Sequence, residues 1–425
     1  MVADEQSRYE ECKKQIHDTV RQRIDLSREV TDAEIQDMID DLIVGLGRKY
    51  ALSLNERQEL GKSVFYAIRK MDVLQELIDC DEVTEIMING TENIFIEKSG
   101  HIYEWDKHFD TREKLENVIQ QIVAKCNRVV NEASPIVDAR LENGSRVNIV
   151  LAPVALNGPI VTIRRFPNHP ISMEDLLQFG SITKQASDEL EKLVIAGYNI
   201  FISGGTGSGK TTFLNALSHY IPKEERIITI EDSAELQLQG IPNLVRLETR
   251  NANTDGAKMI TIRDLIKSAL RMRPNRIIVG EVRGSEAIDM LQALNTGHDG
   301  SLSTGHANSS RDMLVRLETM VLMGMDLPLA AVRRQIASGL DIIVHLGRLR
   351  DKSRRVLEIV EIVGFENGEI LTMPLYQFEE RGVEEGKVIG ELVKVNGLTH
   401  TEKLAAAGIK EEKGLEEQDY EYQKK

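Results

Sequence analysis

The chain has 425 residues, enough for roughly two to four domains with a large buried core. Apolar residues make up 41% of the chain and charged residues 28%, which is typical of an ordinary soluble globular protein. The 68 Asp and Glu outnumber the 53 Lys and Arg, and the resulting net charge of −15 disfavours a protein that binds a long nucleic-acid duplex, although a local basic patch remains compatible with it.

No segment of the sequence indicates export or membrane insertion. The first residues contain no apolar core of a signal peptide. The uncharged stretch 147–163 falls short of the roughly 18 apolar residues that a spanning helix needs, and its Pro and Gly residues favour two strands joined by a turn. Cys12, Cys80 and Cys126 form no CxxC pair, so they indicate neither a disulfide framework nor a metal site. We therefore expect a cytoplasmic protein with no direct membrane insertion.

Residues 1–80 are predicted to be helical. In TDAEIQDMIDDLIVGL, Thr31 and Glu34 form a capping box, and apolar residues then recur at helical spacing. Ser53 and Glu56 repeat the same pattern before a second apolar series. We expect a small helical N-terminal arm or bundle without chemistry of its own.

Residues 81–178 are predicted to form an α+β domain. Runs of β-branched residues, interrupted by Asn-Gly turns, surround one helical stretch, REKLENVIQQIVAKCNRVV. The segment PNHPISMEDLLQFGS at its end is interpreted as a linker to the next domain.

Residues 179–350 alternate short apolar runs with helical patterns. The runs are NIFIS, RIITI, RIIVG, SLST and DIIVHL, and they predict a mainly parallel α/β sheet with helices on both faces. Residues 351–425 are expected to form a C-terminal hairpin, at EIVGFENGEILTM, followed by a charged, Gly-broken and mobile tail.

A phosphate-binding loop lies between the first of these strands and a helix. Its signature is Gly204-x-x-x-x-Gly209-Lys210-Thr211, in which glycines let backbone N–H groups turn toward phosphate oxygens at a helix N-terminus. Lys210 is expected to reach the β- and γ-phosphates of ATP, and the Thr211 hydroxyl to ligate Mg²⁺. The alternative is a Gly-rich turn without a ligand. The expected cradle consists of Gly204, Gly205, Thr206, Gly207, Ser208, Gly209, Lys210, Thr211 and Thr212.

Two further strands end in acidic residues. Glu281 follows the RIIVG strand, where a carboxylate can sit beside the metal and the attacking water; a solvated strand-end glutamate is the alternative. The RIITI strand ends in Glu231, Asp232 and Glu235, which repel one another unless a cation or water lies between them. The alternative for DSAE is the N-cap of a helix, which does not exclude catalysis.

Four stretches in a fixed order carry a family resemblance: GGTGSGKTT, TIEDSAEL, RMRPNRIIVGEVRGSEA and GHDGSLSTGHANS. Together they resemble the secretion or traffic ATPases of type II and type IV secretion and of type IV pili. RPNRIIVGEVRG and the spacing of two histidines are most similar to the CpaF/TadA-type branch, which serves Flp/Tad pilus assembly. The resemblance covers roughly residues 80–350, and the chain lacks the tetracysteine zinc module of some type II relatives.

The resemblance implies a RecA-like P-loop ATPase core that assembles as a homo-hexamer. It implies a cytoplasmic protein, peripheral at the inner face of the cell membrane, that hydrolyses ATP with Mg²⁺ to drive an integral-membrane platform protein. By position, the resemblance makes Gly204–Thr211 the Walker A loop and Glu281 the Walker B acid, which would also ligate the metal. It makes Glu231, Asp232 and Glu235 the aspartate box. Of these three, Glu235 is the better candidate for the general base.

His298 and His306, at the two ends of SLST, correspond to the family's histidine box. This strand should lie next to the strand of Glu281, so the loop after it would bring His306 to the γ-phosphate side, where imidazole can donate a hydrogen bond. His298 could report the presence of phosphate to a neighbouring helix or subunit. The alternative is a pair of structural histidines.

Arginines can stabilise the transition state from a neighbouring subunit. The resemblance favours Arg146 and Arg164 over Arg140 and Arg165, and an ordinary surface ion pair is the alternative for each. Further candidates in the core are Arg271, Arg273 and Arg283.

Two other functions compete with a motor. One is a nucleotide-gated switch or scaffold without significant turnover, which the presence of both Glu235 and Glu281 disfavours. The other is a RecA-like nucleic-acid translocase, which the acidic charge and the lack of clustered aromatic residues disfavour. We therefore expect no nucleic-acid partner.

Overall fold

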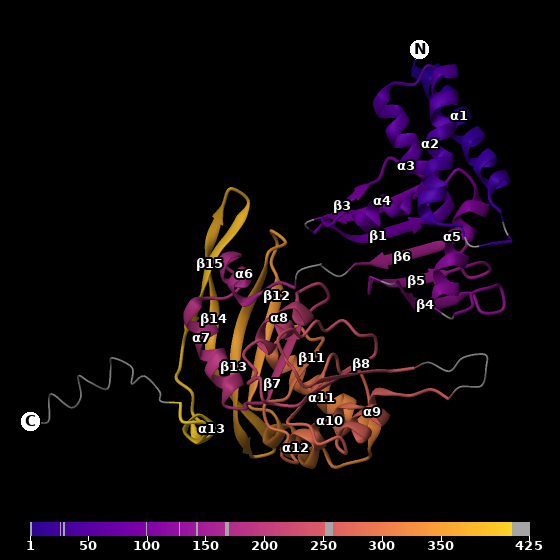
Figure 1. The fold of residues 1–425 in the computed structure, drawn as a ribbon. Helices are drawn as coiled ribbons and strands as arrows, with labels where there is room; N and C mark the ends of the chain where they lie inside the picture. Colours follow the sequence, from indigo (N-terminus) through magenta and orange to yellow (C-terminus); the bar gives the residue numbers. More distant parts are fainter. Residues whose placement is uncertain are drawn as a thin grey trace, which may run out of the picture. The chain divides into compact units, whose positions relative to one another are not determined.

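The protein is described by a computed structural model, shown in Figure 1, that divides into two compact units, Met1–Asn168 and His169–Lys425. The described residues are 2–25, 27–28, 30–98, 100–126, 128–141, 143–165, 170–250 and 258–409.

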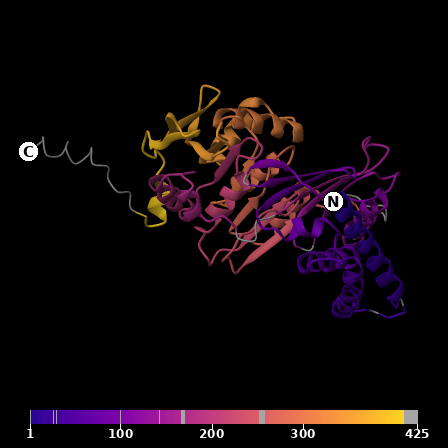
Figure 2. The same cartoon turned by 90° about the horizontal axis from the view of Figure 1, so that it is seen from above.

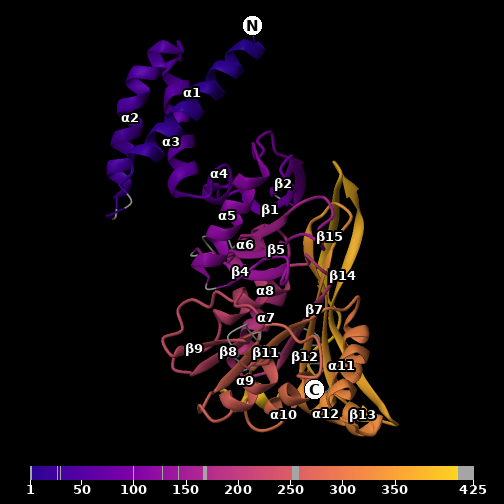
Figure 3. The ribbon, with the colours of Figure 1, turned by 90° about the vertical axis from the view of Figure 1, so that its right-hand side faces the viewer.

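The first unit begins with three helices that pack on one another. They are α1 (Val2–Arg23), α2 (Asp32–Lys49) and α3 (Leu54–Arg69). The predicted capping boxes are both present: the side chains of Thr31 and Ser53 accept hydrogen bonds from the backbone N–H groups of Glu34 and Glu56. The three helices enclose an apolar core of their own, which Figure 3 shows as a separate bundle.

A six-stranded antiparallel sheet forms the rest of the first unit, in the order β3-β2-β1-β6-β5-β4. Its elements are α4 (Leu74–Asp79), β1 (Val83–Asn89), β2 (Asn93–Lys98), β3 (His101–Glu104), α5 (Arg112–Lys125), β4 (Ile136–Arg140), β5 (Arg146–Val150) and β6 (Ile160–Arg164). The uncharged stretch 147–163 supplies β5, a turn and β6, as predicted. In the part of the chain that the structure describes, no helix is long and apolar enough to cross a membrane.

The second unit is built on a nine-stranded sheet in the order β15-β14-β13-β12-β7-β11-β10-β8-β9. All five predicted strands are present: β7 (Ile200–Gly204), β8 (Ile227–Glu231), β10 (Arg276–Val279), β11 (Leu302–Gly305) and β12 (Ile342–Arg348). They run parallel to one another and to the additional strand β9 (Leu244–Glu248).

Helices cover both faces of this sheet, which confirms the predicted fold class (Figure 2). Ile200 and Ile202 of β7 pack in the core that one set of helices covers, whereas Phe201 packs in the core on the other face. The first set is α6 (Met173–Gln178), α7 (Lys184–Ile195) and α8 (Lys210–Ser218). The second is α9 (Ile262–Ala269), α10 (Ala287–Leu294), α11 (Ser310–Gly324) and α12 (Leu329–Gly339).

The C-terminal segment corrects one expectation. The predicted hairpin exists, but its strands are not a separate appendage, because β13 pairs antiparallel with β12 and so extends the central sheet. Residues expected to be a mobile tail form β15 and α13, with Leu404 buried in the main core. Because the polar residues on the exposed sides of these elements outnumber the buried apolar ones, the sequence pattern favoured a mobile tail. The bounds are β13 (Arg354–Glu366), β14 (Glu369–Glu384), β15 (Lys387–Lys394) and α13 (Glu402–Ala406). The rest of the expected tail, 410–425, lies outside the described residues.

The expected linker PNHPISMEDLLQFGS is a second difference. Its residues 167–169 lie outside the described part, but Ser172 caps α6, and Met173 and Leu176 are buried in the core of the second unit. The division between the units therefore falls at Asn168 and His169, before the boundary expected after residue 178.

Candidate active site

The phosphate-binding loop joins the end of β7 to the start of α8. Gly209 has a φ of 94°, a left-handed conformation that favours glycine. A Cβ atom at Gly204 would lie 2.5 Å from the carbonyl oxygen of Leu346, so only glycine fits there. The loop leads directly into the N-terminus of α8 at Lys210. The free N–H groups and the positive dipole end of that helix suit an anion.

Lys210 is held inside the loop. Its side chain is nearly buried, and its Nζ donates hydrogen bonds to the carbonyl oxygens of Gly204, at 3.1 Å, and Gly205, at 3.0 Å. The same ammonium lies 3.3 Å from Nδ1 of His306. Lys210 thus stands where a phosphate group can replace its carbonyl partners.

His306 lies between Lys210 and Glu281. Because β11 is the strand between β7 and β10, its following loop reaches both the phosphate loop and the acid after β10, as predicted. Nε2 of His306 lies 2.9 Å from Oε1 of Glu281. Burial, and then the charge of Lys210, lower the pKa of His306. In the neutral ring Nδ1 can accept from Lys210, while Nε2 faces Glu281 as a close contact.

Glu281 is also paired with Arg283, whose Nη2 lies 2.7 Å from Oε2. Arg283 thus occupies Oε2, whereas Oε1 lies close to His306 but accepts no hydrogen bond among the described residues. Glu235 is the acid that approaches Thr211: the Thr211 hydroxyl lies 3.5 Å from Oε2 of Glu235.

The other two acids of this group make structural contacts. Glu231 is 3% exposed, and its Oε1 accepts hydrogen bonds from the backbone N–H groups of Glu235, at 2.7 Å, and Leu236, at 2.8 Å. Burial raises the pKa of Glu231 to about 7. Asp232 accepts a hydrogen bond from the Thr249 hydroxyl at 2.8 Å. No helix begins here, so the alternative of a helix cap is wrong; Glu231 instead fixes the turn that carries Glu235.

Family membership follows from a match along most of the chain. The sequence profile described as "Type II/IV secretion system protein" matches residues 68–411. The chain belongs to the type II/IV secretion system protein family. The predicted family is therefore confirmed, whereas its CpaF/TadA branch stays a prediction.

Individual relatives are similar over most of both chains. The identity is 34% over 312 residues with the conjugal transfer protein TrbB of Rhizobium radiobacter, covering 73% of this chain and 93% of that one. It is 32% over 315 residues with the type IV secretion system protein PtlH of Bordetella pertussis, covering 68% and 93%. Among solved structures, the VirB11 ATPase of the Brucella suis type IV secretion system is 30% identical, covering 67% of this chain and 94% of that one, with a TM-score of 0.37.

His298 of this type II/IV secretion system protein lies away from the phosphate loop. It precedes β11, whereas the loop follows the opposite, carboxyl end of the neighbouring β7. Its Nδ1 lies 3.1 Å from the carbonyl oxygen of Ala293, and its own carbonyl accepts a hydrogen bond from Ser301. The structure therefore does not bring His298 together with His306, and its relay role stays a prediction.

Arg146 and Arg164 belong to the first unit and face each other. They are direct partners in the β5–β6 pairing, Arg140 is opposite Arg146 on β4, and Glu85 is opposite Arg164 on β1. Residues directly opposite across a sheet project from the same face, so three arginines form one row. Arg165 is different: its buried guanidinium donates to the carbonyl oxygen of Val83 at 2.8 Å, a structural role.

Sequence reasoning missed two residues that support the His306 loop. His345 of β12 is 5% exposed; its Nδ1 lies 2.9 Å from the Ser203 hydroxyl, and it also hydrogen-bonds to the backbone of Asn308. Glu358, its partner on β13, accepts a hydrogen bond from the N–H of Ser310 at 2.8 Å. A histidine inside the otherwise apolar run DIIVHL was the one signal available.

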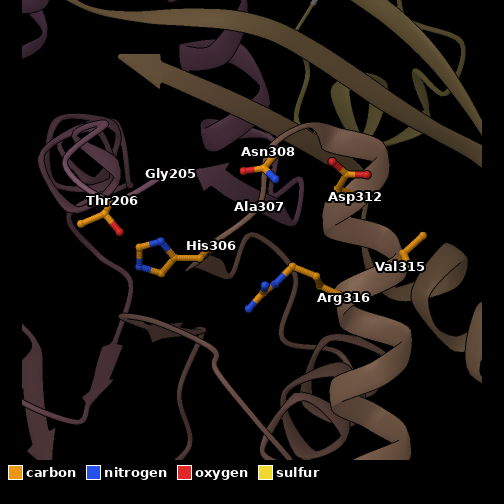
Figure 4. A pocket seen from close by; sticks show the side chains of 8 residues that line it. All are labelled: Gly205, Thr206, His306, Ala307, Asn308, Asp312, Val315 and Arg316. Atoms are coloured by element: carbon orange, nitrogen blue, oxygen red, sulfur yellow. The ribbon is translucent and has the colours of Figure 1, made fainter. Parts of the chain in front are cut away.

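A pocket of about 510 Å³ opens beside the phosphate loop, as Figure 4 shows. Its lining comes from the loop, from the segment after β11 and from the first turns of α11: Gly205, Thr206, His306, Ala307, Asn308, Asp312, Val315 and Arg316.

Hydroxyl and carboxylate oxygens fit a magnesium ion next to the loop. Mg²⁺ in nucleotide sites takes one or two protein oxygens and completes its coordination with phosphates and water. Thr211 and Glu235 provide such oxygens 3.5 Å apart. Among the described residues, no group of three His, Cys, Asp or Glu side chains could hold a metal by itself.

Proposed function

We propose that this protein hydrolyses ATP to power a type II/IV secretion or pilus-assembly machine. The observation that carries the proposal is the contact series Lys210–His306–Glu281, which joins the phosphate loop to the acid after β10. Such a series lets the protein couple the presence of a terminal phosphate to the arrangement of its acidic groups. Family membership supports the same conclusion.

Substrate binding begins with an exchange of partners at Lys210. The phosphates of ATP lie on the N–H groups of the loop and of α8, and the ammonium of Lys210 leaves the carbonyls of Gly204 and Gly205 for the β- and γ-phosphates. Thr211, with Glu235 or Glu281, would hold Mg²⁺, which neutralises charge on the phosphate oxygens. His306 then loses its hydrogen bond from Lys210, so Nδ1 becomes available on the γ-phosphate side.

Glu235 acts as the general base. It takes a proton from water as the water oxygen bonds to the γ-phosphorus, and the bond between that phosphorus and the β–γ bridging oxygen breaks, which leaves ADP and inorganic phosphate. Glu231 holds Glu235 in place through its two backbone hydrogen bonds. Glu281, fixed by His306 and Arg283, orients the water.

Assembly completes the site in this proposal. The protein forms a homo-hexamer in which Arg146 and Arg164 supply positive charge to a nucleotide. The row of arginines across β4, β5 and β6 supports this, because it gathers three positive charges on one face of the sheet.

The partner is proposed to be an integral-membrane platform protein, reached from the inner, cytoplasmic face of the cell membrane. The motifs similar to the CpaF/TadA branch favour a Flp/Tad-type pilus system. Names of relatives include conjugal transfer and type IV secretion proteins, so type IV secretion is the broader form of the proposal.

The test is phosphate release by the purified full chain with Mg-ATP, measured per subunit over a range of protein concentrations beside Lys210→Ala. Specific activity that rises with concentration and disappears in Lys210→Ala supports a site completed by assembly. Turnover that survives in Lys210→Ala refutes the site assignment. Tight ATP binding without turnover at any concentration would favour the switch or scaffold, and salt-dependent binding of single-stranded DNA would favour the translocase.

A further inference from the structure

The pocket between the phosphate loop and α11 is larger than the Lys210 contacts require. It extends from Gly205 and Thr206 of the phosphate loop to Arg316, which lies two turns into α11. At roughly 30 Å³ for each water, a volume of about 510 Å³ holds a small anion together with its hydration shell. No step described so far uses the part of this space that adjoins Arg316.

Arg316 is the cationic side chain of the lining. Figure 4 shows its side chain directed from α11 into the pocket, toward the side on which His306 lies. Among the described residues, its guanidinium makes no ion pair and no side-chain hydrogen bond. Asp312, the one carboxylate of the lining, lies one turn earlier in the first turn of α11, where the helix dipole offsets a negative charge.

The field of Arg316 reaches the catalytic centre. Its positive charge is the smallest of those that lower the pKa of His306, after burial, Lys210 and Arg283. His306 is therefore neutral and brings no positive charge of its own to the pocket wall. An anion entering from the loop meets Arg316 as its cationic partner, with the N–H groups of the loop behind it.

We propose that this pocket is an anion site that receives inorganic phosphate after hydrolysis, with Arg316 as its ligand. The inference rests on the proposed ATP hydrolysis and adds to it where the product goes. When the β–γ bond breaks, the phosphate moves from Lys210 toward Gly205 and Thr206, and the guanidinium of Arg316 binds two of its oxygens. Lys210 can then return to its carbonyl partners and to His306, the arrangement that the structure shows.

The experiment measures binding of radiolabelled inorganic phosphate to the full chain by equilibrium dialysis, with saturating Mg-ADP. We expect one phosphate for each subunit in the wild type. Arg316→Ala should weaken phosphate binding roughly ten- to hundredfold, the worth of one charge-assisted hydrogen-bonding group, and leave ADP binding unchanged. Arg316→Lys should bind with intermediate affinity, because it keeps the charge and loses the fork of donors.

Arg311→Ala is the matched control, because Arg311 is an exposed arginine on the same helix that does not line the pocket. It should bind phosphate as the wild type does. Equal phosphate affinity in the wild type and Arg316→Ala, or no phosphate binding by the wild type with ADP in place, overturns the inference and leaves ATP hydrolysis untouched. A smaller assembly in Arg316→Ala with unchanged phosphate affinity also overturns it and assigns the pocket to a neighbouring subunit. Failure of the proposed function is separate, since it appears as turnover in Lys210→Ala.

Discussion

Nε2 of His306 lies 2.9 Å from Oε1 of Glu281, while the other ring nitrogen faces the ammonium of Lys210. One imidazole therefore connects Lys210, the proposed phosphate ligand, with the acid after the adjacent strand. The connection exists because β11 lies between β7 and β10 in the sheet, so three loops at the carboxyl edge meet. The protonation state of one histidine then affects both neighbours.

The acid limb of the pH–rate profile should report His306. Its pKa is lowered below the usual 6.5, so the ring stays neutral at neutral pH and becomes charged only as the pH falls below that value. The charged ring repels Lys210 and no longer accepts its hydrogen bond, so kcat/KM should fall on the acid side of pH 6.5. Measuring kcat/KM from pH 5 to 8 checks this.

His306→Ala is the control for that limb. Removing one hydrogen-bonding group on the phosphate side should lower kcat by about 10²- to 10³-fold. In the variant, kcat/KM should no longer show the fall below pH 6.5 that protonation of His306 causes. An unchanged acid limb in the variant would show that another group titrates there.

Substitutions of the two acids that follow β8, Asp232 and Glu235, should affect kcat to different extents. Glu235 approaches Thr211, whereas Asp232 is bonded to Thr249. Glu235→Gln should lower kcat by about 10²- to 10⁴-fold, the usual contribution of a general base, and leave ATP binding intact. Asp232→Asn, which keeps an acceptor for the Thr249 hydroxyl, should retain most of the activity. The opposite ranking in steady-state kinetics would move the base to Asp232.

Glu231 should make stability depend on pH. Its pKa is raised from 4.5 to about 7, so the folded protein binds this proton more tightly than the unfolded chain does. The stabilisation is fully present below pH 4.5 and is lost as the pH rises through 7, by roughly 3 kcal/mol in total. Thermal melting should therefore show a Glu231 contribution that decreases across this window.

Glu231→Gln isolates that contribution. The amide oxygen still accepts from the N–H groups of Glu235 and Leu236, and no charge is buried. The difference in melting temperature between variant and wild type should shift in favour of the variant as the pH rises through 7. Because Oε2 of Glu231 has no partner among the described residues, the new NH₂ group lacks an acceptor, which offsets part of the gain. A pH-independent difference would contradict the assignment.

Local patterns predicted the strands of the second unit and the position of the glycine-rich loop between β7 and α8. Runs such as RIIVG are uniformly apolar because both faces of β10 are buried, and such runs are visible without any partner. The strand β9, LVRLE, lies at the sheet edge with half-exposed residues and gave no comparable signal. The same holds for β15, in which Val388 and Leu392 are buried while charged residues between and beside them are exposed. The alternative of a helix start after β8 was wrong, because an acid that caps a helix can equally cap a turn.

Contacts between distant residues could not be predicted. His345 and Ser203 are 142 residues apart, and they meet only because β12 pairs with β7 in a register that places them opposite each other. A similar limit applies to Glu281, whose pairing with His306 depends on strand order. The sequence predicted which side chains carry chemistry, whereas the strand order of the sheet decides which of them meet.

His345 should act as a positioning residue for His306. Its ring links Ser203, just before the phosphate loop, to the backbone of Asn308, two residues after His306. His345→Phe keeps the ring and removes both hydrogen bonds, so the loop of His306 should loosen. We expect kcat to fall roughly tenfold with ADP affinity unchanged, and stability to fall by about 1–3 kcal/mol. Greater exposure of His306 should also move its acid limb toward pH 6.5, since burial is the main cause of its lowered pKa.

Tyr376→Phe is the matched control for this loss of a buried hydrogen bond. The Tyr376 hydroxyl donates to Oε2 of Glu189 at 2.5 Å, and neither residue lines the pocket or belongs to the contact series of the active site. This variant should lose stability but keep the wild-type kcat and pH profile. A purely structural role of His345 predicts the same behaviour for His345→Phe. A shift of the acid limb in His345→Phe, absent from Tyr376→Phe, therefore distinguishes positioning of His306 from general destabilisation.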